Sequence, residues 1–273
     1  MLDPKVINWF FSGSCNLKCK FCYGSYNEDK LSLKEKRGIV DKIKDAGSEK
    51  LTITGGEPLL AKNLKEIIDY AKNRGLFVSL HTNGVLLDEK KITGFKHNVG
   101  RISLPLEGIS NKTNCLLRNY EGYFDLILDR LEALKANEIP IAVKTVATNL
   151  NIHELPKMVP ILEKYKPTVW LISQFVPEGR GLTNKKELSI TDSQFVSLKN
   201  DLKDSPLNIS FRSVSDSITR PNFFIDSNGN VFTSGRNDKI LIGNIFEDEV
   251  IDLWQKILTI NPADEHFFDN LCI

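Results

Sequence analysis

Residues 50–84 read KLTITGGEPLLAKNLKEIIDYAKNRGLFVSLHTNG, and this stretch decides the fold that the sequence predicts. KLTIT is a short β-branched run typical of a buried strand, and FVSLH is a second run of this kind. NLKEIIDYAKNRG lies between them and carries apolar residues at helical spacing. A strand, a helix and a further strand in this order predict parallel pairing through a right-handed crossover.

The same strand and helix unit recurs on both sides of this stretch. Further strands are predicted at 5–12, 101–106, 141–148 and 169–176, and helices at 31–47, 88–96, 123–138 and 153–165. Six strands separated by helices predict an α/β protein with an open or partial (βα)6 barrel of the TIM type. The C-terminal ends of the strands are then the expected place for an active site.

The remaining sequence has a different pattern. Residues 179–190 are polar and predict a loop, followed by a helix near 191–203. Asn228-Gly229 within NFFIDSNGNVFTS predicts a hairpin, and a last helix is expected near 247–258. We therefore expect a core barrel at 1–178 and a small C-terminal α+β extension at 179–273.

Composition limits the possible partners. The 273 residues include 36 basic and 35 acidic side chains, which gives a formal charge of +1. No global electrostatic field then favours nucleic acid or an anionic membrane, so we expect neither as a partner. The first residues lack the basic start and long apolar run of a signal peptide, and we expect a cytoplasmic protein.

SCNLKCKFCY at 14–23 holds three of the five cysteines and directly follows the first predicted strand. Zinc is one alternative for Cys15, Cys19 and Cys22, but a structural zinc site needs four ligands and no fourth Cys or His is near in sequence. A [4Fe-4S] cluster accepts thiolates at such short spacing, and three of them leave one iron open for reaction. Three ordinary buried thiols are the remaining alternative.

Two motifs in this sequence resemble signatures of the radical S-adenosylmethionine (SAM) enzymes. CNLKCKFC matches their three-cysteine motif, with Phe21 in its aromatic place, and GGEP follows the second strand. The resemblance covers about 5–178 and implies a [4Fe-4S] cluster whose fourth iron is chelated by SAM. It also implies that Glu57 and the backbone around Gly55 and Gly56 meet the ammonium group of SAM.

Other candidate site residues follow the later strands. Asn83 ends the third strand and is expected to face the barrel mouth or, alternatively, to cap the following helix. The resemblance implies that Ser103 meets the SAM ribose and that Arg118 lies near the SAM carboxylate. Lysine in a parallel strand is costly unless it reaches the mouth or a partner, so Lys144 is a candidate substrate or SAM contact. We expect Arg118 and Lys144 together to anchor an anionic group.

The subgroup that the sequence resembles most includes the molybdenum-cofactor cyclase, SPASM-domain peptide-modifying enzymes and viperin. FFIDSNGNVFTSG resembles the start of a SPASM domain, but Thr233 and Ser234 stand where its first cysteine is expected, so we predict a single cluster. Lys144 matches one basic residue with which viperin binds a triphosphate, whereas Leu171 replaces a second. We therefore expect small anionic metabolites or peptides to be better substrates than nucleoside triphosphates.

The resemblance implies an enzyme that cleaves SAM reductively and removes a hydrogen atom from a small-molecule or peptide substrate. An electron donor such as flavodoxin or ferredoxin is then a partner. Cys115 and Cys272 are candidate hydrogen-atom donors, although free cysteines are more often small buried apolar residues. Viperin-like modification of nucleoside triphosphates and a non-catalytic iron-sulfur or zinc module remain the alternatives.

Overall fold

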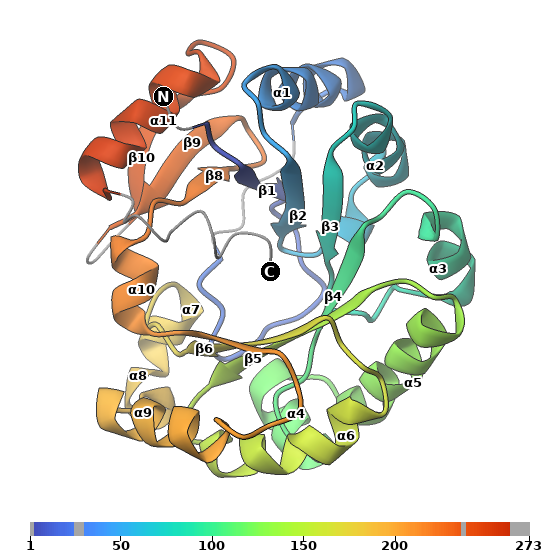
Figure 1. Cartoon of the computed structure of the whole chain (residues 1–273), viewed down its shortest axis with the longest axis vertical. Coiled ribbons are helices and arrows are strands. Elements are labelled where there is room, and N and C mark those ends of the chain that lie inside the picture. Colours follow the sequence, from blue (N-terminus) through green and yellow to red (C-terminus); the bar gives the residue numbers. More distant parts are fainter. Residues whose placement is uncertain (1–2, 25–29, 236–238, 263–273) are drawn as a thin grey trace.

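The computed structural model describes residues 3–24, 30–235 and 239–262. In these residues one sheet contains the strands β1 (Val6–Ser12), β2 (Lys50–Gly55), β3 (Phe77–His81), β4 (Arg101–Pro105), β5 (Ile141–Ala147), β6 (Val169–Gln174), β7 (Ile209–Arg212), β8 (Phe223–Ile225), β9 (Asn230–Ser234) and β10 (Lys239–Asn244). Their order is β10-β9-β8-β1-β2-β3-β4-β5-β6-β7, so the sheet does not close. Figure 1 shows the sheet curling around a central space, with helices on its outer side.

The predicted parallel strands and crossover helices are confirmed. β8 and β1 through β7 run parallel, and β9 pairs antiparallel with both β8 and β10. The helices and 3-10 helices are α1 (Leu33–Asp45), η1 (Pro58–Leu60), α2 (Leu64–Asn73), α3 (Glu89–Phe95), α4 (Asn111–Arg118), α5 (Tyr123–Ala136), η2 (Ile152–Met158), α6 (Val159–Glu163), α7 (Arg180–Thr183), α8 (Lys185–Leu188), α9 (Asp192–Asp201), α10 (Val214–Thr219) and α11 (Val250–Ile260). Among the described residues, no helix has the length and apolar character needed to cross a bilayer.

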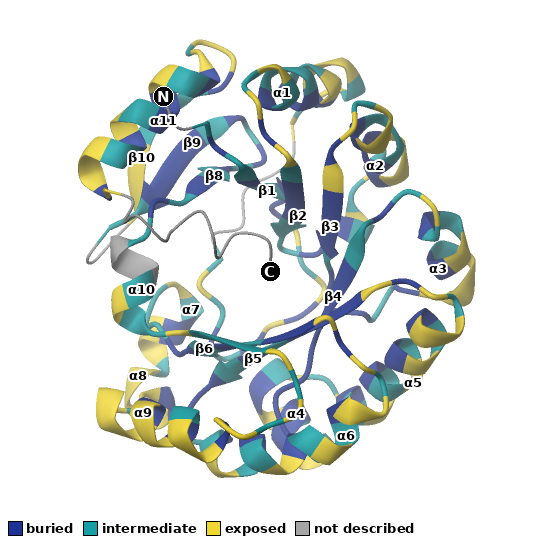
Figure 2. Cartoon of the chain, viewed as in Figure 1, coloured by how far each residue is buried: buried dark blue, intermediate teal, exposed yellow. Residues whose placement is uncertain are grey.

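Side-chain alternation separates the core from the barrel interior. On β1, Ile7, Trp9 and Phe11 have no exposed surface, whereas Asn8 and Phe10 between them are half-buried and line cavities. Figure 2 shows buried residues along the strands and on the inner sides of the helices. The apolar core therefore lies between sheet and helices, and the other side of each strand is free to build a site.

The C-terminal extension is built into the barrel sheet. β7 pairs with β6 at one side, and β8 pairs with β1 at the other. The predicted hairpin is confirmed as β8 and β9, with Gly229 at φ 85° in its turn. The same sheet thus contains the described strands of both proposed segments.

Two local predictions differ from the structure. Residues 179–190 were expected as a loop, but they contain α7 and α8, which dock on the chain around the cysteines. The predicted helix at 153–165 divides into η2 and α6, with Pro156 inside the 3-10 segment. Proline has no backbone N–H, which interrupts the α-helical hydrogen-bond pattern at this point.

Candidate iron-sulfur and cofactor site

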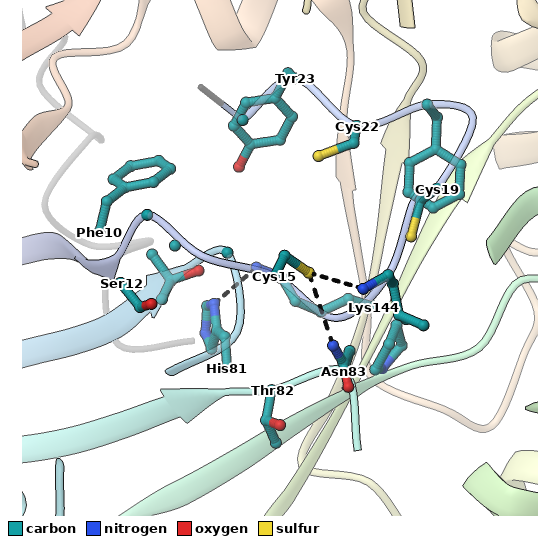
Figure 3. Close-up of a pocket in the computed structure, with 18 of the residues that line it drawn as sticks. Phe10, Ser12, Cys15, Cys19, Cys22, Tyr23, His81, Thr82, Asn83 and Lys144 are labelled. Carbon is teal, nitrogen blue, oxygen red and sulfur yellow. Dashed lines mark hydrogen bonds between the residues drawn. The ribbon is translucent and has the colours of Figure 1, made fainter. Parts of the chain in front are cut away.

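A cavity of about 440 Å³ lies at the C-terminal ends of the parallel strands. Figure 3 shows the three clustered cysteines around it, together with Asn83 and Lys144. Ten of the residues predicted from the sequence line this cavity: Cys15, Cys19, Phe21, Cys22, Gly55, Gly56, Asn83, Ser103, Arg118 and Lys144. The strand topology therefore brings together side chains that are up to 129 positions apart in the sequence.

The three clustered cysteines lie on the segment that leaves β1. Cys19 is buried, while Cys15 and Cys22 are half-buried, and burial raises the pKa of both Cys15 and Cys19. In the part of the chain that the structure describes, no three His, Cys, Asp or Glu side chains converge on a position for one metal ion. Three thiolates fit a cubane, which binds each thiolate through a different iron and leaves the fourth iron open.

The GGEP turn is joined directly to the cysteine segment. The amide of Gly56 donates to the carbonyl of Ser12 over 2.7 Å, and the amide of Glu57 donates to that of Ser14 over 2.8 Å. A Cβ atom at Gly56 would overlap the Ser14 carbonyl, and Gly55 has a φ of 122° that side chains rarely allow. Both glycines are therefore needed to place backbone beside the cysteines.

The Glu57 carboxylate is held by groups behind the wall of the cavity, and its contact with SAM stays a prediction. It has no exposed surface and is not among the residues that line the cavity. Its carboxylate accepts hydrogen bonds from Thr82 Oγ1 and the Asn83 amide, both over 2.7 Å, and from the Leu59 amide over 3.0 Å. Burial raises the pKa of Glu57 and these hydrogen bonds oppose that rise. The geometry thus favours a positioning role for this carboxylate.

Asn83 is the residue that Glu57 places in the cavity. Its Nδ2 donates to Asn16 Oδ1 over 2.7 Å and lies 3.9 Å from the sulfur of Cys15. The hydrogen bonds therefore run from Glu57 through Asn83 to the cysteine segment.

Arg118 lines the cavity as one member of a buried ion pair. Its guanidinium contacts the carboxylate of Glu107, which has no exposed surface, and its Nη1 lies 3.7 Å from the sulfur of Cys19. The guanidinium also lies 4.8 Å from the centre of the Phe21 ring. Because Glu107 compensates its charge, Arg118 brings less net positive charge to the cavity than the sequence suggested.

Lys144 comes from the middle of β5 and lies beside His81, with 3.1 Å between Nζ and Nδ1. Burial lowers the pKa of Lys144 to about 7, and the charges of Arg212, Arg101 and Lys50 act in the same direction. No ion pair with a carboxylate is found for Lys144 among the described residues. Its contact with an anionic group stays a prediction.

Of the two candidate hydrogen-atom donors, the structure describes one. Cys115 is half-buried on α4 and does not line the cavity. Cys272 lies outside the described residues.

Sequence reasoning missed the segment that supports the cysteines from outside. The Gly181 amide donates to the Cys22 carbonyl over 3.2 Å, and Asn184 Nδ2 donates to the Lys20 carbonyl over 2.9 Å. Arg180 Nη1 donates to the carbonyl of Cys19 over 3.3 Å. The only sequence signal was the pair of glycines in EGRG, which is consistent with a close approach of two backbones.

Several known proteins are similar to this chain. The AdoMet-dependent heme synthase of Methanosarcina barkeri is 28% identical over 183 residues, which cover 65% of this chain and 52% of the relative. An S-adenosylmethionine-dependent nucleotide dehydratase of Lacinutrix mariniflava is 27% identical over 216 residues, covering 72% and 44%. The chain thus spans about half the length of the curated relatives it matches.

The fold is also shared with a solved structure. SuiB of Streptococcus suis, in its crystal structure with bound S-adenosylmethionine, aligns with a TM-score of 0.74 at 18% identity. The alignment covers 98% of this chain and 67% of SuiB. The family profile described as Radical SAM superfamily matches residues 9–159, which include the three clustered cysteines and the GGEP turn. This chain therefore belongs to the radical SAM superfamily.

Proposed function

We propose that Cys15, Cys19 and Cys22 hold a single [4Fe-4S] cluster at which SAM binds to the open iron. The radical SAM family uses this cluster and SAM as cofactors, and its members similar to this chain are enzymes, as this chain is. Reductive cleavage of SAM would supply a 5′-deoxyadenosyl radical that removes a hydrogen atom from the substrate. The observation that carries the proposal is one cavity lined by three thiols and the Gly55-Gly56 backbone.

The other predicted residues have roles that follow from their positions. Gly55 and Gly56 present backbone to the ammonium of SAM, and Asn83 and Ser103 offer polar groups beside it. Phe21 and Arg118 cover the cluster side of the cavity. Phe10 contributes another aromatic surface, which restricts water around a reactive intermediate.

The similar proteins act on or bind substrates of more than one class. SuiB has been solved with its precursor peptide SuiA, and the relative from Methanosarcina barkeri is named as a heme synthase. We therefore propose a substrate that is either a peptide or a small molecule. Nucleotide modification is not favoured over them, because relatives with several different activities match over similar spans.

We assign residues 1–178 to the core barrel and 179–273 to the C-terminal extension.

The proposed cluster needs a reductant, and an electron donor such as flavodoxin or ferredoxin would reduce it. Three cysteines at the mouth, with no second cysteine group in the described residues, support a single cluster.

Anaerobic reconstitution tests the proposal. The protein should bind about four iron and four sulfide per chain and then form 5′-deoxyadenosine from SAM under reducing conditions. Cys22→Ala should lose both properties, whereas the matched control Cys115→Ala should keep the cluster because Cys115 lies outside the cavity. Stoichiometric zinc, or about eight irons per chain, would contradict the single-cluster assignment.

A further inference from the structure

A second cavity, of about 380 Å³, lies beside the cluster cavity. The two cavities share His81, Ser103 and Lys144 in their linings. Among the described residues, no Asp or Glu lines the second cavity, whereas several basic side chains do: Lys5, which pairs with Glu49, and Lys50, His81, Arg101, Lys144, Arg212 and Arg220. Lys144 is the one amine in this part of the chain that lines both spaces.

Strand register brings Lys144 and His81 together across β4. His81 is in register with Ser103 on β4, and Ser103 is in register with Ala142 on β5. Lys144 lies two positions after Ala142 and therefore on the same side of β5. The small side chain of Ser103 leaves room between β3 and β5, and Lys144 Nζ lies 3.1 Å from His81 Nδ1. The amine is thus held by an imidazole at the wall of the cluster cavity, where Figure 3 labels both residues.

The surroundings favour the uncharged form of the Lys144 amine. Burial lowers its pKa to about 7, and the charges of Arg212, Arg101 and Lys50 act in the same direction. Burial and nearby charges also lower the pKa of His81 well below its ordinary value. Among the described residues, no carboxylate forms an ion pair with Lys144. A desolvated lysine beside other cations is a nucleophile, because its free amine keeps a lone pair at neutral pH.

We propose that Lys144 is a catalytic residue that forms an imine with an aldehyde or ketone group of the substrate. This inference rests on the proposed function, because the rest of the substrate would extend from Lys144 into the cluster cavity. The covalent bond would fix the C–H bonds next to the former carbonyl carbon within that cavity. This role differs from the anion contact predicted for Lys144, since a neutral amine brings no charge to an anion.

Imine formation at Lys144 is balanced without a further reagent. The lone pair of Nζ attacks the carbonyl carbon, and a C–N bond replaces the π bond between carbon and oxygen. An imidazole with its own proton on Nε2 presents Nδ1 as an acceptor, so His81 takes the proton that the nitrogen releases and returns it to the oxygen. The oxygen then leaves as water with the second amine proton, and the C=N bond forms. The products are one imine and one water, and nothing is oxidised or reduced.

Reductive trapping of the reconstituted protein measures imine formation without SAM. Propanal and cyanoborohydride at pH 7 convert each imine to a stable secondary amine, which peptide mass spectrometry locates. Lys144 should be modified at least about 10-fold faster than Lys91, because an exposed lysine is almost wholly protonated at this pH. Lys91→Gln is the control variant and should keep the trapping at Lys144, whereas Lys144→Met should lose it and keep the modification of other lysines.

A further variant tests the part of His81. His81→Phe should slow trapping at Lys144 by at least about 10-fold, because the proton acceptor beside the amine is removed. Circular dichroism checks that each variant is folded. Equal trapping rates in this variant and the unchanged protein would contradict the proton transfer to His81.

Two outcomes would overturn the inference as a whole. Trapping at Lys144 that is no faster than at Lys91 would mean that Lys144 is not a nucleophile. Alcohols that stimulate 5′-deoxyadenosine formation as well as the corresponding aldehydes and ketones would mean that the substrate needs no carbonyl. Failure of the proposed function looks different, because 5′-deoxyadenosine would then form with none of these compounds while Lys144 would still be trapped.

Discussion

At the scale of single residues, Glu57 shows how a motif position can act through its neighbours. Its carboxylate holds the Thr82 hydroxyl and the Asn83 amide, and Asn83 in turn contacts the cysteine segment. A direct contact with SAM and a positioning role would both make Glu57 important for activity. The two roles differ in what they predict for the stability of the protein without SAM.

We expect Glu57→Gln to destabilise the protein without SAM by about 1–3 kcal/mol, because an amide nitrogen would replace one buried acceptor oxygen. Chemical denaturation measures this change in the free energy of unfolding. Glu66→Gln is the matched control, since Glu66 is exposed on α2 and should change stability by less than about 0.5 kcal/mol. Unchanged stability together with weaker SAM binding would favour the direct contact instead.

Lys144 should make stability depend on pH. Its pKa of about 7 in the folded chain lies below the ordinary value of 10.5, and its charged neighbours are Lys50, Arg101 and Arg212, with His81 in contact. Between these two values the unfolded chain binds more protons, so the contribution of Lys144 makes the protein more stable as pH rises. Below pH 7 the full cost of the buried charge is present.

We therefore expect Lys144→Met to be more stable than the unchanged protein at pH 6, with the difference shrinking toward pH 10. Denaturation curves across this range measure the effect. Parallel pH profiles for the two proteins would show that Lys144 keeps its ordinary pKa in the folded chain. Lys91→Gln serves again as the control, because its exposed side chain should leave the profile unchanged.

At the scale of elements, the sequence predicted the repeating strands and helices of the barrel. It missed the elements whose position depends on contacts with distant parts of the chain. The strands β1 to β6 have alternating or apolar patterns of their own, so periodicity located them. The helices α7 and α8 are four residues each, and their position depends on hydrogen bonds to the segment around Cys19 and Cys22. The two glycines of EGRG indicate a close approach of two backbones, but the local sequence does not identify the partner segment. The inward placement of Lys50 and Arg101 was missed for the same reason.

Gly179 provides a test of this contact between elements. It has a φ of 52°, and a Cβ there would lie 3.0 Å from the Cys22 carbonyl and from the Tyr23 backbone. Gly179→Ala should displace the cysteine segment and lower the iron bound after reconstitution. Gly122→Ala is the control, because Gly122 also has a positive φ, of 71°, but has open space around it. Equal iron content in the two variants would mean that the contact does not support the cluster.

At the scale of the whole molecule, both sides of the core sheet depend on the extension. β7 pairs with the edge of β6, and β8 pairs with the edge of β1, the strand that leads into the cysteines. Unpaired edges expose backbone groups that promote association between molecules. The boundary at 178 therefore divides two segments of sequence that share one sheet.

A chain that ends at residue 178 should aggregate or remain unfolded, because it would expose the strand edges of β1 and β6. Size-exclusion chromatography and circular dichroism would reveal this. Adding residues 179–273 as a separate polypeptide should restore a soluble complex if strand pairing is the cause. A monomeric, folded core at 1–178 would show that the extension is dispensable for the sheet.

The three residues shared by the two cavities have a thermodynamic consequence. Because His81, Ser103 and Lys144 face both spaces, a ligand that orders them on one side changes the free energy of binding on the other. Linkage requires the effect to be reciprocal: the factor by which a ligand in the second cavity changes SAM binding must equal the factor by which SAM changes the binding of that ligand. A favourable coupling would keep SAM poorly bound until substrate arrives and so protect it from wasteful cleavage.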